Sequence, residues 1–160
     1  MKNMLSLVLF TLMLGCGPGA PAPLKHGTLE NAAAASRPAS ESSDIMNREA
    51  QSNFTKVKHI LISWDKGDGK AHPNAVGRSE KEAEEKAVML LGRVNAGEDM
   101  DSLMSEFSED PGSAQSGISY DVTPDAGLVF EFKRMGLRLH LDESGLVLSD
   151  FGWHIIKRVE

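Results

Sequence analysis

Two histidines stand in strand-like runs at the two ends of the predicted domain, and they are the first candidates for chemistry. His154 lies in residues 151–157, where aromatic and β-branched residues surround a glycine, a composition typical of a β-strand. Alternation along that strand places His154 and Ile156 on one face. His59 occupies a similar run at residues 56–63. Because two terminal strands of a small domain are natural neighbours in a sheet, we expect the two imidazoles to meet.

Other interpretations of these residues remain open. Either histidine taken alone is better explained as a satisfied core or edge residue, and only the pair in matching settings points to a site. Asp110 taken alone is equally well explained as a residue that caps a turn. Ser149, His154 and Asp110 could also form an acyl-transfer triad. The sequence has no G-x-S-x-G elbow and no oxyanion motif, so the triad is the weaker interpretation.

Four ordered motifs carry a resemblance to a known family. The first and last are VKHIL at residues 57–61 and FGWHII at residues 151–156. Between them lie GEDM followed by a leucine at residues 97–103, and FSED followed by a serine at residues 107–113. In order and spacing, residues 55–160 resemble a parvulin-type peptidyl-prolyl cis-trans isomerase. The resemblance implies an α+β fold with a four-stranded antiparallel sheet surrounded by helices.

The resemblance also implies roles for particular residues. His59 and His154 would form the hydrogen-bonded floor of the site, and Asp110 stands where the family carries Asp or Cys. Ser149 matches a hydroxyl position in the same network. No metal or other cofactor is expected, because the two isomers of an X-Pro bond are nearly balanced in free energy. The remaining matches, all in the apolar pocket for the proline ring, are Leu128, Phe132 and Phe151.

The chain departs from the family pattern around the expected substrate groove. The family usually carries Gly-Gly-x-Leu-Gly after the site Asp or Cys, whereas residues 116–121 read SGISYD. The third helix carries MGL at residues 135–137 in place of the usual Ala-Ala-Phe, and the turn before Leu146 is one residue short. A polar Ser119 near the usual Leu should weaken substrate binding by about 1–3 kcal/mol, the scale of burying one aliphatic side chain. We therefore expect a raised KM.

Three helices are expected to position the strands. Ser79 and Glu82 form a capping box at the start of the first helix, and Asp99 can cap the second. The third helix is expected over residues 129–139. Apolar residues recur at helical spacing in all three. The residues expected to face the core are Ala83, Ala87, Leu90, Leu91, Val94, Met100, Leu103, Met104, Phe107, Phe132, Met135 and Leu139.

Composition excludes several functions. The chain has 160 residues and 41% hydrophobic residues, enough for one globular domain with appendages. Its net charge of −6 offers no basic stripe for nucleic acid. Lys66, Lys70 and Arg78 alternate with Asp65 and Asp68, so their loop is better explained as solvated than as a phosphate or Ca²⁺ site. The single cysteine excludes an intrachain disulfide.

The N-terminal segment indicates export. Residues 1–15 carry a lysine at position 2 and continue with an apolar run. This run is too short to span a bilayer but suits a signal peptide. The small residues before Cys16 resemble a bacterial lipoprotein signal, in which this cysteine is lipidated. An ordinary secretory signal or a buried apolar segment is the alternative. Residues 16–52, rich in Ala, Pro and Ser, are expected to be a flexible tether, with the isomerase domain at 53–160.

These features together predict an isomerase that acts on proline-containing unfolded or exported polypeptides. We expect a monomer held at the membrane of the cell envelope through lipidated Cys16. The alternative from another class is a binding module of the same fold that holds unfolded envelope proteins without catalysis. A purely structural lipoprotein has no feature in its favour.

Overall fold

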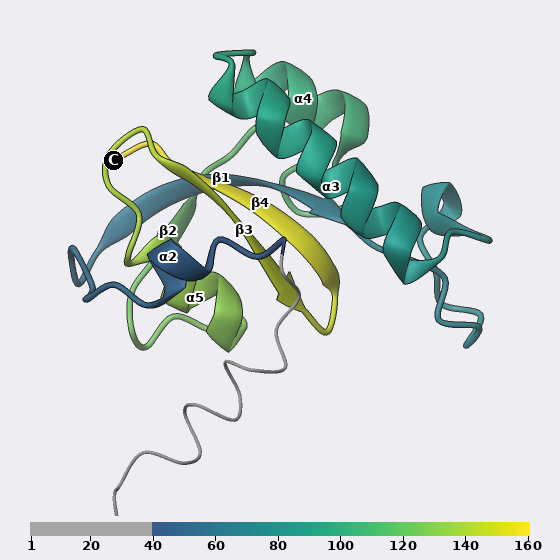
Figure 1. Ribbon diagram of the computed structural model, residues 1–160, viewed down its shortest axis with the longest axis horizontal. Helices are drawn as coiled ribbons and strands as arrows, with labels where there is room; N and C mark the ends of the chain where they lie inside the picture. The colour runs from purple at the N-terminus through teal and green to yellow at the C-terminus, as the bar shows by residue number, and fades with distance from the viewer. Residues whose placement is uncertain (1–39) are drawn as a thin grey trace, which may run out of the picture. The chain divides into compact units, whose positions relative to one another are not determined.

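The computed structural model describes residues 40–160, so the predicted signal peptide, Cys16 and most of the predicted tether lie outside the described residues. The described part is an α+β domain with a four-stranded antiparallel sheet and helices on both faces (Figure 1), as expected. No helix in it is long and apolar enough to cross a membrane. The elements are α2 (Ser43–Met46), β1 (Thr55–Ile62), the 3-10 helix η1 (Pro73–Ala75), α3 (Glu80–Asn95), α4 (Met100–Phe107), β2 (Tyr120–Val122), α5 (Phe130–Gly136), β3 (Ser144–Ser149) and β4 (Gly152–Arg158).

The two predicted terminal strands lie side by side in the centre of the sheet, whose strand order is β2-β1-β4-β3. In the antiparallel register of β1 and β4, His59 pairs with Ile156 and Leu61 pairs with His154. Both histidines therefore project from the same face of the sheet, on neighbouring strands, with one residue pair between their positions. Trp153 and Ile155 project from the opposite face and pack in a different core cluster.

Helices α3 and α4 cover the face that carries Trp153 and Ile155 (Figure 1). The capping box is present: Ser79 Oγ accepts from the amide of Glu82, and the Glu82 carboxylate accepts from the amide of Ser79. Asp99 caps α4 as expected and accepts from the amide of Ser102 at 2.9 Å. The predicted apolar stripes are confirmed, except that two of their residues are only partly buried. These are Leu91 and Phe107.

Helix α5 and the short helix α2 pack on the other face of the sheet, which carries the histidines (Figure 1). Helix α5 is shorter than the predicted range 129–139. Phe132, Met135 and Leu139 are nevertheless buried as expected. Leu139 is buried although it lies after the end of α5. The apolar spacing in the sequence therefore extends beyond the residues that are helical.

The structure corrects the expected start of the domain. Residues 40–52 were assigned to the tether, but Ile45 and Met46 in α2 are 4% and 0% exposed and belong to the core under α5. The amide of Ser42 donates to the carbonyl of Leu146 at 2.9 Å, along the outer edge of β3. The guanidinium of Arg48 forms two 2.7 Å hydrogen bonds with the carboxylate of Glu143, the residue just before β3. A four-residue helix is too short to show an apolar period, so the sequence does not predict that it packs in the core.

Candidate active site

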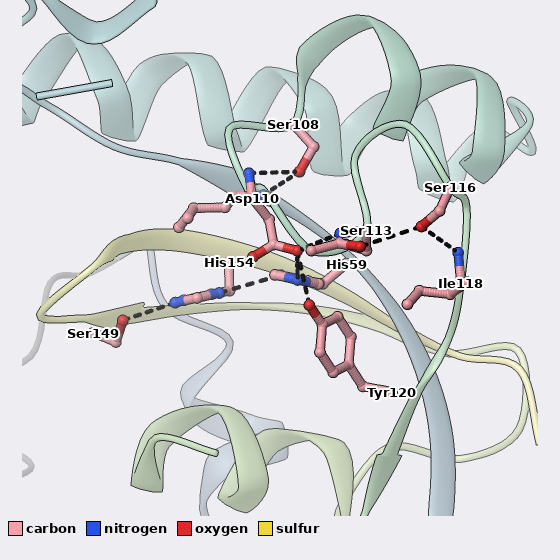
Figure 2. A network of polar contacts seen from close by, with 11 residues as sticks. His59, Ser108, Asp110, Ser113, Ser116, Ile118, Tyr120, Ser149 and His154 are labelled. Carbon is pink, nitrogen blue, oxygen red and sulfur yellow. Dashed lines mark hydrogen bonds and ion pairs between the residues drawn. The ribbon is translucent and has the colours of Figure 1, made fainter. Parts of the chain in front are cut away.

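His59 and His154 meet on the α5 face, as the strand alternation predicted. Their Nδ1 atoms lie 3.3 Å apart, and each residue is 4% exposed. On the far side of His154, its Nε2 lies 2.7 Å from the hydroxyl of Ser149 at the end of β3. Figure 2 shows these side chains in one line, with Asp110 above His59. Three residues expected in the site are thus joined by direct contacts.

Asp110 closes this line from the loop that follows α4. Its Oδ2 lies 3.4 Å from His59 Nε2, and it accepts from the amide of Ser113 at 2.8 Å and from its hydroxyl at 2.7 Å. The hydroxyl of Tyr120 donates to the same oxygen at 2.9 Å. Burial by itself would raise the pKa of Asp110, but the donors His59, Ser113 and Tyr120 outweigh it and hold the pKa well below the ordinary 3.8. Asp110 is therefore ionised.

The charge of Asp110 and the burial of His154 constrain the protons of the network. Burial, with a smaller contribution from neighbouring His59, lowers the pKa of His154 to about 3, so this imidazole is neutral. An ionised Asp110 can only accept, which puts a proton on His59 Nε2. The remaining two contacts of the line join the two Nδ1 atoms and join His154 Nε2 to the hydroxyl of Ser149. Each holds one proton, and the tautomers of the two rings set which atom donates it. The amide of Phe151 completes the line by donating to Ser149 Oγ at 3.1 Å.

This arrangement is not an acyl-transfer triad. In such a triad a carboxylate contacts the histidine that activates the serine. Here His59 stands between His154 and Asp110, and Ser149 is only 7% exposed. The serine is thus an end of a buried hydrogen-bonded line rather than an exposed nucleophile.

Of the three expected pocket residues, Phe132 contacts the network directly. The ring of Phe132 is edge-on to His59 and His154, with centroids 4.9 and 5.5 Å away. Leu128 is partly buried against the same core cluster. Phe151 differs: it sits in the two-residue turn between β3 and β4 and is 62% exposed. Its contact with the network is made by its backbone amide rather than its ring.

The turn that carries Phe151 depends on a glycine. Gly152 has a φ of +146°, and a Cβ there would lie 2.5 Å from the carbonyl oxygen of Ile62. A side chain at this position would therefore collide with backbone at the end of β1. The glycine allows β4 to start directly against β1, two residues before His154.

Two further residues belong to the site, Tyr120 and Ser113, and neither is predicted from the sequence to contact Asp110. Tyr120 lies within residues 116–121, which we interpreted as a loss of apolar wall at Ser119. Its ring stands edge-on to His59 at 5.2 Å between centroids, so this segment places an aromatic group beside the histidine. A Cβ at Gly112 would lie 2.4 Å from the Tyr120 hydroxyl oxygen. Two signals pointed to Ser113: its place in the FSED-serine motif, and its position three residues after an Asp, a common spacing for local capping bonds.

Two of the cations of the loop after β1, Arg78 and Lys66, are engaged within the protein. The guanidinium of Arg78 pairs with the buried carboxylate of Glu109 at 2.6 Å, and the ammonium of Lys66 donates to the carbonyl of Asp150. Among residues 40–160, no group of three or more His, Cys, Asp or Glu side chains could hold a metal ion.

Comparison with known proteins establishes the family. The family model described as a PPIC-type PPIASE domain matches residues 43–160. The chain therefore belongs to the PPIC-type, or parvulin, family of peptidyl-prolyl isomerase domains, and the resemblance seen in the four motifs is confirmed. The matched range begins at the first residue of α2, in agreement with the packing of that helix.

Relatives with this domain include folding factors. The chaperone SurA of Pseudomonas aeruginosa is 37% identical over 102 residues, which cover 63% of this chain and 22% of that protein. The foldase protein PrsA of Geobacillus kaustophilus is 36% identical over 81 residues, or 50% of this chain and 27% of that protein. The chain thus spans less than a third of the length of these relatives.

Solved structures agree in fold. The peptidylprolyl isomerase PrsA from Bacillus cereus superposes with a TM-score of 0.51 and 28% identity, covering 74% of this chain and 38% of that one. The solution structure of TbPIN1 gives a TM-score of 0.59 at 20% identity, covering 69% of this chain and 100% of that one. At that identity the second likeness concerns the fold alone.

Proposed function

We propose that this domain catalyses the cis-trans rotation of X-Pro bonds in proline-containing polypeptides. The observation that carries the proposal is the unbroken polar line from Ser149 through His154 and His59 to Asp110, packed against the ring of Phe132. The line supplies a fixed, water-poor polar surface, and the aromatic ring supplies an apolar surface for the proline. In this proposal His59, Asp110, His154 and Ser149 form the catalytic network, and Leu128, Phe132 and Phe151 bind the substrate.

The reaction sets modest chemical demands. Rotation of a peptide bond is opposed by a barrier of about 18–20 kcal/mol from amide resonance, and the two isomers of an X-Pro bond differ by only about 0.5–1 kcal/mol. No bond is broken and no redox cofactor is needed. The site has only to bind the twisted amide more tightly than either planar isomer.

The electrostatics of the site favour the twisted amide. In the planar amide, resonance places negative charge on the carbonyl oxygen, and twisting removes part of it. A carbonyl placed near ionised Asp110 is repelled less when it is twisted, because its oxygen then carries less negative charge. Asp110 keeps its charge because three neighbouring side chains donate to it. The pre-formed donors mean that little reorganisation is needed during the reaction.

The proposed clients are unfolded or exported polypeptides, and the proposed location is the cell envelope. The family membership and the names of two relatives, a chaperone and a foldase, support the first point. The apolar run before Cys16 supports the second. Lipid on Cys16 would anchor the chain, since each acyl CH₂ placed in the membrane contributes about 0.8 kcal/mol. We propose that the chain acts as a monomer.

A second candidate function is a binding module that holds unfolded chains without catalysis. The residues Phe130 and Phe151 are 63% and 62% exposed, and Ile118 is 53% exposed. Exposed apolar side chains of this size can hold unfolded polypeptide without any reaction. The loss of the usual Leu at Ser119 also favours this candidate.

An isomerisation assay separates the two candidates. The full chain in detergent is mixed with an Ala-Pro peptide, and kcat/KM is compared for wild type, His59→Ala, Asp110→Asn and Ser119→Leu. We expect the first two variants to lose at least tenfold, which corresponds to about 1.4 kcal/mol, and Ser119→Leu to lower KM. The variant His140→Ala, at an exposed histidine outside the network, is the control.

The outcome that rejects catalysis is equally concrete. If wild type is no faster than the uncatalysed reaction but suppresses aggregation of an unfolded client, the binding module is the correct function. If the His59 and Asp110 variants remain folded and keep the wild-type rate, the proposed network is wrong.

Anchoring is tested separately in a bacterial host. Cys16→Ser should abolish acyl labelling and leave an uncleaved precursor. Labelling that is unchanged in this variant would reject the lipid anchor.

A further inference from the structure

Glu109, next to Asp110 in the chain, is a buried carboxylate that the catalytic proposal does not use. Its side chain is 0% exposed. One oxygen accepts from the amide and the hydroxyl of Ser63, at 2.7 and 2.6 Å, and the other accepts from Arg78 at 2.6 Å. Burying a carboxylate costs several kcal/mol unless its partners replace water. The chain thus carries a buried carboxylate, with its cost in desolvation free energy, directly beside the site.

One partner of Glu109, Ser63, directly follows the strand that carries His59. β2 pairs with β1 only between Thr55 and Val57. Further along the same edge, the carbonyl of Leu61 accepts from the amide of Glu109 at 2.8 Å, and the amide of Leu61 donates to Ser108 Oγ at 3.1 Å. Residues 108 and 109 therefore continue the pairing of β1 where β2 has ended, with Asp110 as the next residue.

Arg78 holds the same strand end from the other side. Its Nη1 donates to the carbonyl of Ser63 at 2.8 Å as well as to Glu109, and its Nη2 donates to the carbonyl of Asn74. The ammonium of Lys86 lies 4.0 Å from the Glu109 carboxylate. Glu109 thus binds the amide and the hydroxyl of Ser63, and Arg78 binds its carbonyl.

We propose that Glu109, with Arg78, is a positioning pair that fixes the Asp110 loop on β1 and thereby sets the contact between Asp110 and His59. This inference rests on the proposed isomerase function, because it assigns the pair a role in that site. The contact of 3.4 Å between His59 Nε2 and Asp110 Oδ2 joins two segments that are far apart in the sequence. Asp110 can keep it only if its loop stays registered on the strand.

The first test reads the geometry without using catalysis. The carboxyl group of Asp110 is titrated by NMR in the full chain for wild type and Glu109→Gln, with Glu85→Gln on the exposed face of α3 as the matched control. A glutamine at position 109 offers one acceptor oxygen, so it can serve Ser63 or Arg78 but not both. Loss of the neighbouring negative charge alone would lower the pKa of Asp110. Displacement of Asp110 from its donors would raise it.

We therefore expect the pKa of Asp110 to rise in Glu109→Gln and to stay unchanged in Glu85→Gln. A fall or no change in the Glu109 variant would overturn the proposal. This readout holds even if the wild-type chain proves to be a binding module, so failure of the positioning role and failure of the catalytic role are distinguishable.

A second variant separates positioning from stability. Replacing a buried ion pair by apolar residues of similar size often restores stability, so Arg78→Met with Glu109→Leu is expected to melt near wild type. It still removes every bond to Ser63 made by these two side chains. If the pair positions Asp110, kcat falls by roughly tenfold to a hundredfold, the range for misplacing a catalytic group by about 1 Å, while KM changes little. Wild-type kcat in the double variant would show that the pair contributes stability alone and would reject the proposal.

Discussion

The Nδ1 atoms of His59 and His154 face each other at 3.3 Å in the middle of the sheet. Such a contact needs one proton between two nitrogens, so both rings cannot be positively charged without losing it. His154 is the ring that stays neutral, because burial and the neighbouring His59 lower its pKa to about 3. The histidine pair therefore ties the stability of the domain to pH.

We predict that stability falls as the pH is lowered from 7 to 4 because of His154. Its pKa is about 3 in the folded state, against an ordinary 6.5. Between these values the unfolded chain binds a proton that the folded chain does not, so the free energy of unfolding decreases by up to about 1.4 kcal/mol per pH unit. Asp110, whose pKa is lowered from 3.8, adds its loss only near and below that pH. Denaturant unfolding at several pH values measures the slope.

The matched variants for this prediction are His154→Gln and His140→Gln. The first should flatten the slope between pH 6 and 4.5, whatever its effect on absolute stability, because the titrating group is gone. The second removes an exposed histidine and should retain the wild-type slope. An unchanged slope in His154→Gln would contradict the assignment.

Ser113→Ala should destabilise the domain and raise the pKa of Asp110. Ser113 is 0% exposed, and its hydroxyl donates to the carboxylate of Asp110. Hydrogen bonds to charged groups contribute about 1.5–3 kcal/mol, so the free energy of unfolding at neutral pH should fall by about that amount. Ser116→Ala removes two exposed bonds, one to the carbonyl of Gly112 and one from the amide of Ile118. It should stay within about 0.5 kcal/mol of wild type. Equal effects of the two substitutions would be inconsistent with this network.

A fragment of residues 53–160 should be markedly less stable than one of residues 40–160. The shorter fragment lacks Ile45 and Met46, whose burial contributes about 1.5–3 kcal/mol for each side chain. Met46→Ala in the longer fragment should by itself cost about 2–5 kcal/mol. Thermal unfolding of the three proteins measures this. Equal melting temperatures for the two fragments would restore the expected boundary at residue 53.

We predict no strong preference for a phosphorylated residue before proline. Arg78 is 13% exposed and paired with Glu109, so it is not free to bind a phosphate. Rates on a phosphoserine-proline peptide and on its unmodified form should agree within about tenfold, or 1.4 kcal/mol. A hundredfold preference for the phosphopeptide would show that Lys66 and Lys70 suffice for recognition.

The parts of the fold that follow simple periods could be predicted from the sequence. The meeting of His59 and His154 followed from alternation in two strands, and the start of α3 followed from the Ser79–Glu82 box. Packing of α2 could not be predicted, because a single buried Ile-Met pair in an Ala- and Pro-rich segment carries no period.

The site was less predictable at its rim than at its floor. Tyr120 lies in a strand of three residues, too short for alternation to show which side chain points inward. In the sequence, Glu109 looks like a solvated acid beside another acid. It is buried because Ser63 and Arg78 approach it in the fold, and Arg78 lies more than 30 residues away in the sequence. Such contacts depend on tertiary packing rather than on local pattern.

The position of β4 in the sheet also determines when the domain can fold. β4 is the last strand of the domain, yet it lies between β1 and β3 and carries His154. A chain emerging from a ribosome or a translocon therefore cannot close its sheet until residues 152–158 have appeared, since neither neighbour can pair across the gap. Until then the apolar groups of β1 stay uncovered, and the domain is itself an unfolded client of whatever folding factors surround it.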